Sequence, residues 1–133
     1  MTDWTKYVGI PQRDHGRDRS GVDCWGLFRL VYAEELGIVL PGYDGDYACA
    51  QEGQENAAVI AGGLVTGPWR RVLTAETFDL VVFLRGRHAC HVACAVDANH
   101  ILHTIGSDSS VIDRLDSRWK ARLAGIYRHE ART

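Results

Sequence analysis

The sequence lacks several features that would assign a protein of this size to a specialised class. Its apolar runs are too short to cross a membrane as a helix, and no run of Lys and Arg interrupts the chain. The formal net charge is −2, which argues against a nucleic acid held on a basic face. Neither an internal repeat nor a low-complexity tract is present. We therefore expect no membrane insertion and no nucleic-acid partner.

The N-terminal residues, MTDWTKYVGI, also lack the basic start and the long apolar stretch of a secretory signal. We therefore expect the protein to be made in the cytoplasm and to leave it only by a route other than secretion. The reducing cytoplasm keeps thiols free, so no disulfide is expected. The chain has four cysteines, Cys24, Cys49, Cys90 and Cys94. The last three are expected to be core thiols, because free cysteine is usually buried.

A length of 133 residues fits one domain, and we expect residues 1–133 to form it. Helical spacing of apolar residues predicts a helix over residues 23–36, with Asp23 or Ser20 as its N-cap and Gly37 at its end. A weaker pattern predicts another helix over 48–61. The second half reads as strands, at 69–72, 79–84, 90–96, 100–105 and 125–129. Helices followed by clustered strands predict an α+β fold, with N-terminal helices packed on a central antiparallel sheet of about five strands.

Cys24 lies on the first turn of the first long helix, directly after Asp23, in the stretch GVDCWGLFRLVY. The first turn of a helix carries unpaired backbone N–H groups and the positive end of the helix dipole. Both stabilise a thiolate, which predicts a lowered pKa for Cys24. The same N–H groups can bind the oxyanion that forms when a carbonyl is attacked. Cys24 is therefore a candidate nucleophile, and a buried structural thiol is the alternative.

Candidate bases lie in the segment HACHVACAVDANHILHT. Strand alternation places His91, Ala93 and Ala95 on one face. Small side chains let a helix approach closely, so the helix that carries Cys24 is expected to pack against this face. A histidine beside two alanines on such a face is a candidate base.

The loop after this strand decides whether a second histidine joins the first. A three-residue loop at 97–99, with Asn99 in the left-handed conformation, predicts that His103 lies diagonally opposite His91. Cys24, His91 and His103 then form a nucleophile, a base and an orienting residue. A two-residue loop would place His103 on the other face.

The same segment raises the possibility of a zinc site, because histidines and cysteines crowd together. On a strand, however, Cys90 and Cys94 are about 13 Å apart at ~3.3 Å per residue. Two ligands at that separation cannot share one tetrahedral ion. We expect no metal and no cofactor.

These residues resemble the NlpC-type cell-wall peptidases, which are compact papain-like cysteine peptidases of bacteria and their phages. The resemblance covers roughly residues 7–105 and rests on Asp-Cys-Trp-Gly-Leu at the helix start, the strand FDLVVF, and His91-Val92-Ala93 followed by His103. It implies a papain-like fold with Cys24, His91 and His103 as the catalytic set. It also implies hydrolysis of peptide bonds in the peptidoglycan stem, commonly between γ-D-glutamate and a diamino acid.

The resemblance further suggests residues that contact the substrate. It implies that Asp23 binds the amino end of the stem peptide. Gln12 stands where many members have Tyr, and Trp25 where many have Ser, and both positions border the substrate site. Arg19, on the loop before the nucleophile, is a candidate for binding stem-peptide carboxylates, and a solvated loop residue is the alternative.

The DCWG form and the RDHGRDRSG loop resemble the subgroup encoded with phage tails and gene transfer agents. This resemblance implies that the protein stays in the bacterial cytoplasm during assembly and then reaches a cell wall on a tail tip. Tail-tip or baseplate proteins would hold it, with residues 38–68 and 106–118 as candidate contact loops. A structural tail-tip plug with little activity and acyl transfer to an amine remain alternatives.

Overall fold

A computed structural model describes residues 2–42, 53–104 and 109–132, with the backbone alone for 53–59. The helical elements are the 3-10 turns η1 (Trp4–Tyr7) and η3 (Glu130–Arg132), the π-helical turn η2 (Tyr32–Leu36), and the α-helices α1 (Cys24–Val31), α2 (Gly53–Thr66) and α3 (Ser117–Lys120). The strands are β1 (Arg17–Asp18), β2 (Gly21–Val22), β3 (Trp69–Val72), β4 (Leu80–Arg85), β5 (His88–Ala95), β6 (His100–Thr104), β7 (Ser110–Arg114) and β8 (Leu123–His129). In this part of the chain, no helix is both long and apolar enough to cross a membrane.

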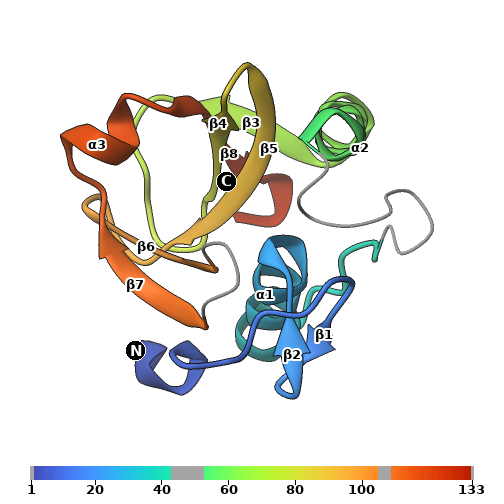
Figure 1. Cartoon of the computed structure of the whole chain (residues 1–133), viewed down its shortest axis with the longest axis vertical. Coiled ribbons are helices and arrows are strands. Elements are labelled where there is room, and N and C mark those ends of the chain that lie inside the picture. Colours follow the sequence, from blue (N-terminus) through green and yellow to red (C-terminus); the bar gives the residue numbers. More distant parts are fainter. Residues whose placement is uncertain (1, 43–52, 105–108, 133) are drawn as a thin grey trace.

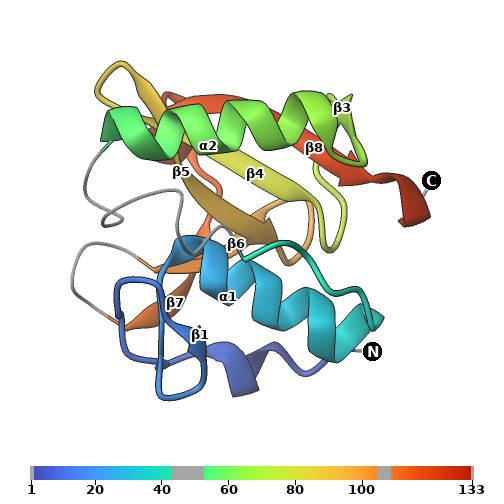
Figure 2. The ribbon, with the colours of Figure 1, turned by 90° about the vertical axis from the view of Figure 1, so that its right-hand side faces the viewer.

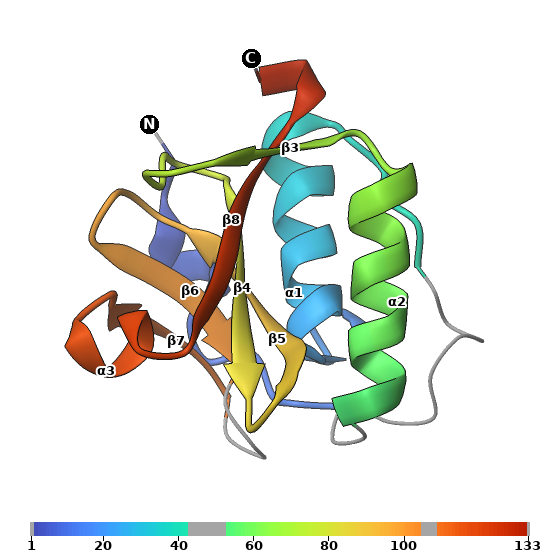
Figure 3. The same ribbon diagram turned by 90° about the horizontal axis from the view of Figure 1, so that it is seen from above.

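The central sheet has six antiparallel strands in the order β3-β8-β4-β5-β6-β7 (Figure 1). Strands β1 and β2 form a separate small hairpin before α1. The helices lie on both sides of the central sheet. Figure 3 shows α1 and α2 on one side and α3 on the other, and Figure 2 shows α1 and α2 in front of the same face of the sheet.

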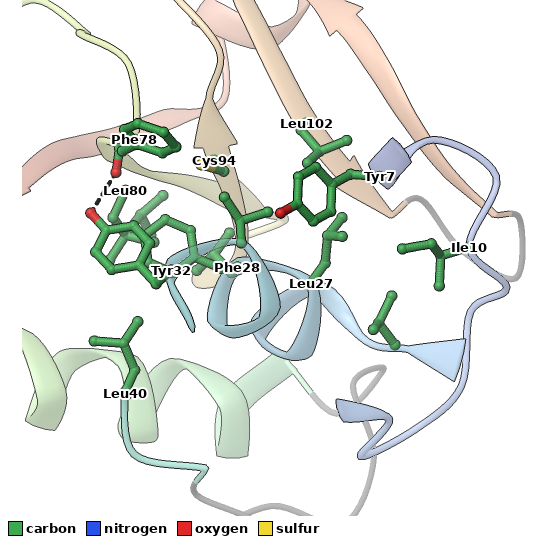
Figure 4. Close-up of a cluster of buried hydrophobic side chains, with 14 residues drawn as sticks. Tyr7, Ile10, Leu27, Phe28, Tyr32, Leu40, Phe78, Leu80, Cys94 and Leu102 are labelled. Carbon is green, nitrogen blue, oxygen red and sulfur yellow. Dashed lines mark hydrogen bonds between the residues drawn. The ribbon is translucent and has the colours of Figure 1, made fainter. Parts of the chain in front are cut away.

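Two hydrophobic layers hold these parts together. On the α1 side, Leu27, Phe28 and Val31 pack against Val92 and Cys94 of the sheet, and Figure 4 shows helix and sheet side chains meeting there. On the other side, Trp119 of α3 closes a smaller cluster. That cluster includes Val81, Phe83, Ala93, Ala95, Ile101, Leu115 and Ile126.

The first helix is bounded as its sequence predicts. The carboxylate of Asp23 caps its N-terminus by accepting a hydrogen bond from the Gly26 N–H, at 2.7 Å. Its helical path continues through η2 and ends at Gly37, which has a φ of 66°. That left-handed conformation favours glycine, because other side chains are strained there.

The predicted α+β class is confirmed, and the differences are local. All five predicted strands are present, and the structure adds β7 and the short strands β1 and β2, in segments where the sequence predicts loops. The second helix extends to Thr66, beyond the predicted end at residue 61, and its predicted start at residue 48 lies outside the described residues. Residues 43–52 and 105–108, which fall in the two candidate contact loops, lie outside the described residues.

A buried hydrogen bond joins η2 to the segment before β4 within the larger core. The Tyr32 hydroxyl donates to the carbonyl of Phe78 at 2.5 Å (Figure 4), and Phe78 has a φ of 74°, which is unusual for a residue with a side chain. Tyr32 is fully buried. Its hydroxyl therefore satisfies a carbonyl that is held in a strained turn.

We predict that Tyr32→Phe lowers the free energy of unfolding by about 1–2 kcal/mol, because the Phe78 carbonyl loses its partner. Urea denaturation followed by circular dichroism measures the change. Tyr127→Phe is the matched control, because no hydrogen bond of its hydroxyl is seen among the described residues. A change below about 0.5 kcal/mol is expected there. Equal effects of the two substitutions would contradict the role of the Tyr32 hydroxyl.

Candidate active site

The start of α1 is held by a buried carboxylate. Asp23 is 1% exposed. Its oxygens accept hydrogen bonds from the Gly26 N–H at 2.7 Å, the His15 N–H at 3.1 Å and the Arg17 guanidinium at 2.9 Å. These contacts fix the loop before the helix onto its first turn. The role that the structure gives Asp23 is therefore to orient Cys24, and its predicted contact with substrate remains a prediction.

Two glycines allow the loop to lie directly on the helix. An ideal Cβ built on Gly26 would come within 1.8 Å of the Gly16 carbonyl oxygen. One built on Gly16 would come within 2.2 Å of the Gly21 carbonyl oxygen. Any side chain at these positions would push the loop away. The glycine of the DCWG motif is thus required by the close approach of two backbone segments.

Cys24 lies where β5 and β6 separate. The described ladder between these strands consists of the pairs Cys94–Leu102 and Ala95–Ile101. If the register continued, Val92 would pair with Thr104 and donate its N–H to β6. The backbone N–H of Val92 instead acts on the Cys24 thiol, and α1 contacts both strands. The thiol therefore lies beside the residue that follows His91.

His91 and His103 are in direct contact, as the sequence predicts. His91 Nε2 and His103 Nδ1 are 2.8 Å apart, and the two side chains are 6% and 0% exposed. On its other side, His103 Nε2 lies 2.8 Å from Asp113 Oδ2. Asp113 was not identified from the sequence, because it lies on β7. The structure thus arranges His91, His103 and Asp113 in a row over β5, β6 and β7.

The hairpin that sets this register has the predicted three-residue loop. The N–H of Val96 donates to the carbonyl of His100 at 2.8 Å. The prediction of a left-handed Asn99 is wrong, because the described non-glycine residues with positive φ are His15 and Phe78. The Asp97 carboxylate closes the loop in its place by accepting from the Asn99 N–H at 2.7 Å.

The prediction that α1 packs on the His91, Ala93 and Ala95 face is also wrong. Leu27 and Phe28 pack on the opposite face of β5. The space above the alanines is filled by Trp119 and Phe83. The Trp119 ring stacks on His91 at 6.0 Å between centroids and meets His103 edge-on at 4.8 Å. Trp119 therefore forms the wall that holds both imidazoles.

Burial reverses the pKa predicted for the nucleophile. It raises the pKa of Cys24 to about 11, and the neighbouring Asp23 carboxylate acts in the same direction. The N–H groups of Val92 and Trp25 and the charge of Arg85 lower the pKa of Cys24, but by less. Burial, with the nearby His103, lowers the pKa of His91. The resting pair is accordingly a thiol and a neutral imidazole.

The structure places the three other predicted substrate residues, Gln12, Trp25 and Arg19, at different distances from Cys24. Gln12 pairs through its backbone with Val22, next to the helix start. The Trp25 indole N–H donates to the Pro41 carbonyl at 2.8 Å, and its ring stacks on Phe28. Gln12 and Trp25 therefore lie near the first turn of α1.

Arg19 lies elsewhere. Its guanidinium pairs with Glu34, with one contact at 2.7 Å. Glu34 belongs to η2, roughly 15 Å along the helix axis from Cys24. The structure thus does not bring Arg19 to the nucleophile.

The other cysteines behave as core residues where they are described. Cys90 and Cys94 are free thiols and are 2% and 1% exposed, while Cys49 lies outside the described residues. Among the described side chains, no group of three or more His, Cys, Asp or Glu residues is arranged to hold a metal ion.

Comparison with known proteins identifies the family. The profile of the NlpC/P60 family matches residues 9–128. The chain belongs to the NlpC/P60 family. The family predicted from the sequence is thus confirmed, and so is the papain-like α+β fold. The subgroup of phage tails and gene transfer agents remains a prediction.

Individual NlpC/P60 relatives are distant. The chain is 24% identical over 123 residues to the murein DD-endopeptidase MepS/murein LD-carboxypeptidase of Escherichia coli K12, and covers 92% of itself and 57% of that protein. Among solved structures, the NlpC/p60 domain of the peptidoglycan hydrolase SagA has a TM-score of 0.62 at 25% identity, with 93% of this chain and 91% of that chain covered. An NLP/P60 family protein similar to lipoprotein, from Staphylococcus aureus, has a TM-score of 0.62 at 23% identity, with 94% and 38% covered. The chain thus spans little more than half of the curated relative.

A raised thiol pKa predicts slow, strongly pH-dependent alkylation of Cys24. Only the thiolate reacts with iodoacetamide, so the rate should rise about tenfold per pH unit from pH 6 to 9. Peptide mass spectrometry distinguishes Cys24 from Cys49, Cys90 and Cys94, and glutathione serves as the reference thiol. A rate that is constant between pH 5 and 8 would instead indicate a preformed thiolate–imidazolium pair.

Proposed function

We propose that this chain is a cysteine peptidase that hydrolyses peptide bonds in the peptidoglycan stem. The observation that carries this proposal is the half-buried Cys24 thiol at the capped start of α1. The thiol lies against the backbone of Val92 in β5, and the preceding residue, His91, forms a buried pair with His103. Family membership supports the reaction class. Two relatives, a murein endopeptidase and a peptidoglycan hydrolase, support the substrate class.

The protonation states support a mechanism that starts from neutral groups. His91 accepts the thiol proton as the sulfur of Cys24 attacks the stem-peptide carbonyl. The new S–C bond displaces the carbonyl electron pair onto oxygen, and backbone N–H groups at the start of α1 hold that charge. The C–N bond then breaks, and His91 gives its proton to the leaving amine. Water hydrolyses the thioester and returns the thiol.

The bond that we propose is the one between γ-D-glutamate and the diamino acid, as the sequence resemblance implies. In this proposal Gln12 and Trp25 border the substrate, since both lie near the start of α1. Asp23 contributes to recognition of the amino end of the stem. Arg19 pairs with Glu34, far along the helix from Cys24. In this proposal it binds a substrate carboxylate only if the substrate is long enough to extend from Cys24 to Glu34.

The direct test is digestion of purified peptidoglycan followed by muropeptide analysis. We expect new stem-peptide fragments from the wild type, and a loss of about 1,000-fold or more in Cys24→Ser and His91→Gln. His100→Gln is the matched control, because His100 belongs to the same hairpin but its side chain is 46% exposed. Its activity should stay within about twofold of the wild type.

The products also separate the alternatives. Fragments that carry an added amine at the new carbonyl end would indicate acyl transfer in place of hydrolysis. A folded wild-type protein that releases no fragment would contradict the peptidase and favour a structural plug. Thermal unfolding establishes that the protein is folded in either case.

We further propose that the chain acts on a phage-like tail tip, held there by tail or baseplate proteins after assembly in the cytoplasm. The DCWG form and the RDHGRDRSG loop support this location. Induced particles purified on a density gradient should contain the chain at a fixed ratio to tail proteins. Its absence from intact particles would contradict the location and leave the peptidase proposal unaffected.

A further inference from the structure

The row of buried polar groups continues past the two histidines to a carboxylate. Asp113 is paired with Ile101 in the β6–β7 ladder, and His103 with Val111. Side chains two residues apart on a strand share a face, so Asp113 and His103 are diagonal neighbours on the α3 side of the sheet. Their contact of 2.8 Å therefore follows from strand register.

This carboxylate determines which ring nitrogens carry protons. An ionised carboxylate only accepts hydrogen bonds, so His103 donates through its Nε2–H to Asp113. In a neutral imidazole the other nitrogen is an acceptor. His103 Nδ1 therefore accepts from the Nε2–H of His91, across 2.8 Å. Nδ1 of His91 is left without a proton, as a general base requires.

Asp113 also balances the charge around the pair. Arg85 of β4 and Arg122, which follows α3, both disfavour the charged form of His91. Arg118 of α3 does the same to His103, and Asp113 opposes it. When His91 takes a proton from the thiol, the new positive charge is therefore opposed by nearby arginines. The carboxylate at the end of the row stabilises that charge through His103.

We propose that Asp113 is a positioning residue that, through His103, fixes the tautomer of His91 and supports its protonation during attack by Cys24. This inference rests on the proposed peptidase function. The transfer itself is balanced, because the thiol proton moves to His91 Nδ1 and later leaves with the amine. Asp113 stays ionised throughout and exchanges no proton.

The kinetic test compares three variants on the muropeptide that the wild type cleaves. Asp113→Asn should lower kcat about 10- to 100-fold with KM changed less than about twofold. Asp113→Glu restores the carboxylate and should recover part of kcat. Glu76→Gln is the control, because Glu76 is also a carboxylate with a charged partner, Arg128 at 3.1 Å, but its side chain is 71% exposed and has no role in the site. Its kcat should match the wild type within about twofold.

A double variant separates positioning from general damage. His103→Asn keeps an acceptor for His91 but ends the path to Asp113. In that background, adding Asp113→Asn should cost less than about twofold in kcat, because the two changes act through one path. A full additional loss would overturn the proposal, and so would an unchanged kcat in Asp113→Asn alone.

Long-range ¹H–¹⁵N spectra of the histidines give a readout that needs no substrate. The wild type should show both His91 and His103 protonated at Nε2, and Asp113→Asn should show a mixture of tautomers. An Nδ1–H form of His103 in the wild type would overturn the inference even if the enzyme is active. If the wild type cleaves no peptidoglycan, the proposed function fails, and these spectra alone decide the assignment of Asp113.

Discussion

The early end of the β5–β6 ladder is the constraint on which the candidate site depends. Two strands that stayed paired would use the Val92 N–H within the sheet and leave no opening for a helix end. Because the described pairing consists of Cys94–Leu102 and Ala95–Ile101, the first turn of α1 reaches both strands. The thiol on one side of the sheet thus reaches the Val92 N–H at a gap in the backbone hydrogen bonds, next along the strand to His91, whose imidazole lies on the other side.

Packing and electrostatics work against each other at this gap. His91 packs against Phe83 and Trp119, and burial raises the pKa of Cys24 and lowers that of His91. Each group is therefore held in its neutral form. The packing that orders the site thus disfavours a thiolate–imidazolium pair in the resting enzyme. The proton must therefore pass from Cys24 to His91 during the reaction.

Sequence patterns predicted the parts of the site that depend on local geometry. The cap before Cys24 and the three-residue hairpin are local, and together they placed His91 beside His103 correctly. The face covered by α1 was not predictable, because both faces of β5 are apolar and alternation alone does not say which helix covers which. The pKa of Cys24 depends on tertiary burial, which a helix-start argument omits. Asp113 was missed because β7 is a short strand whose partner is known only from the sheet.

The position of β7 has a consequence for how the protein loses function on heating. At its Ser110 end β7 is held to the N-terminal segment, because the Gly9 N–H donates to the Ser110 carbonyl at 2.8 Å and the Ser110 N–H to the Ile10 carbonyl at 2.9 Å. Along the rest of its length β7 has one strand neighbour, so local opening there costs less free energy than opening of the strands inside the sheet. β7 carries the carboxylate that contacts His103, whereas α1 and β5 carry the thiol and His91. Fraying of this single edge would disconnect the end of the polar row while both hydrophobic layers stayed folded. Activity is then lost on heating when this edge opens, at a temperature below the melting of the domain.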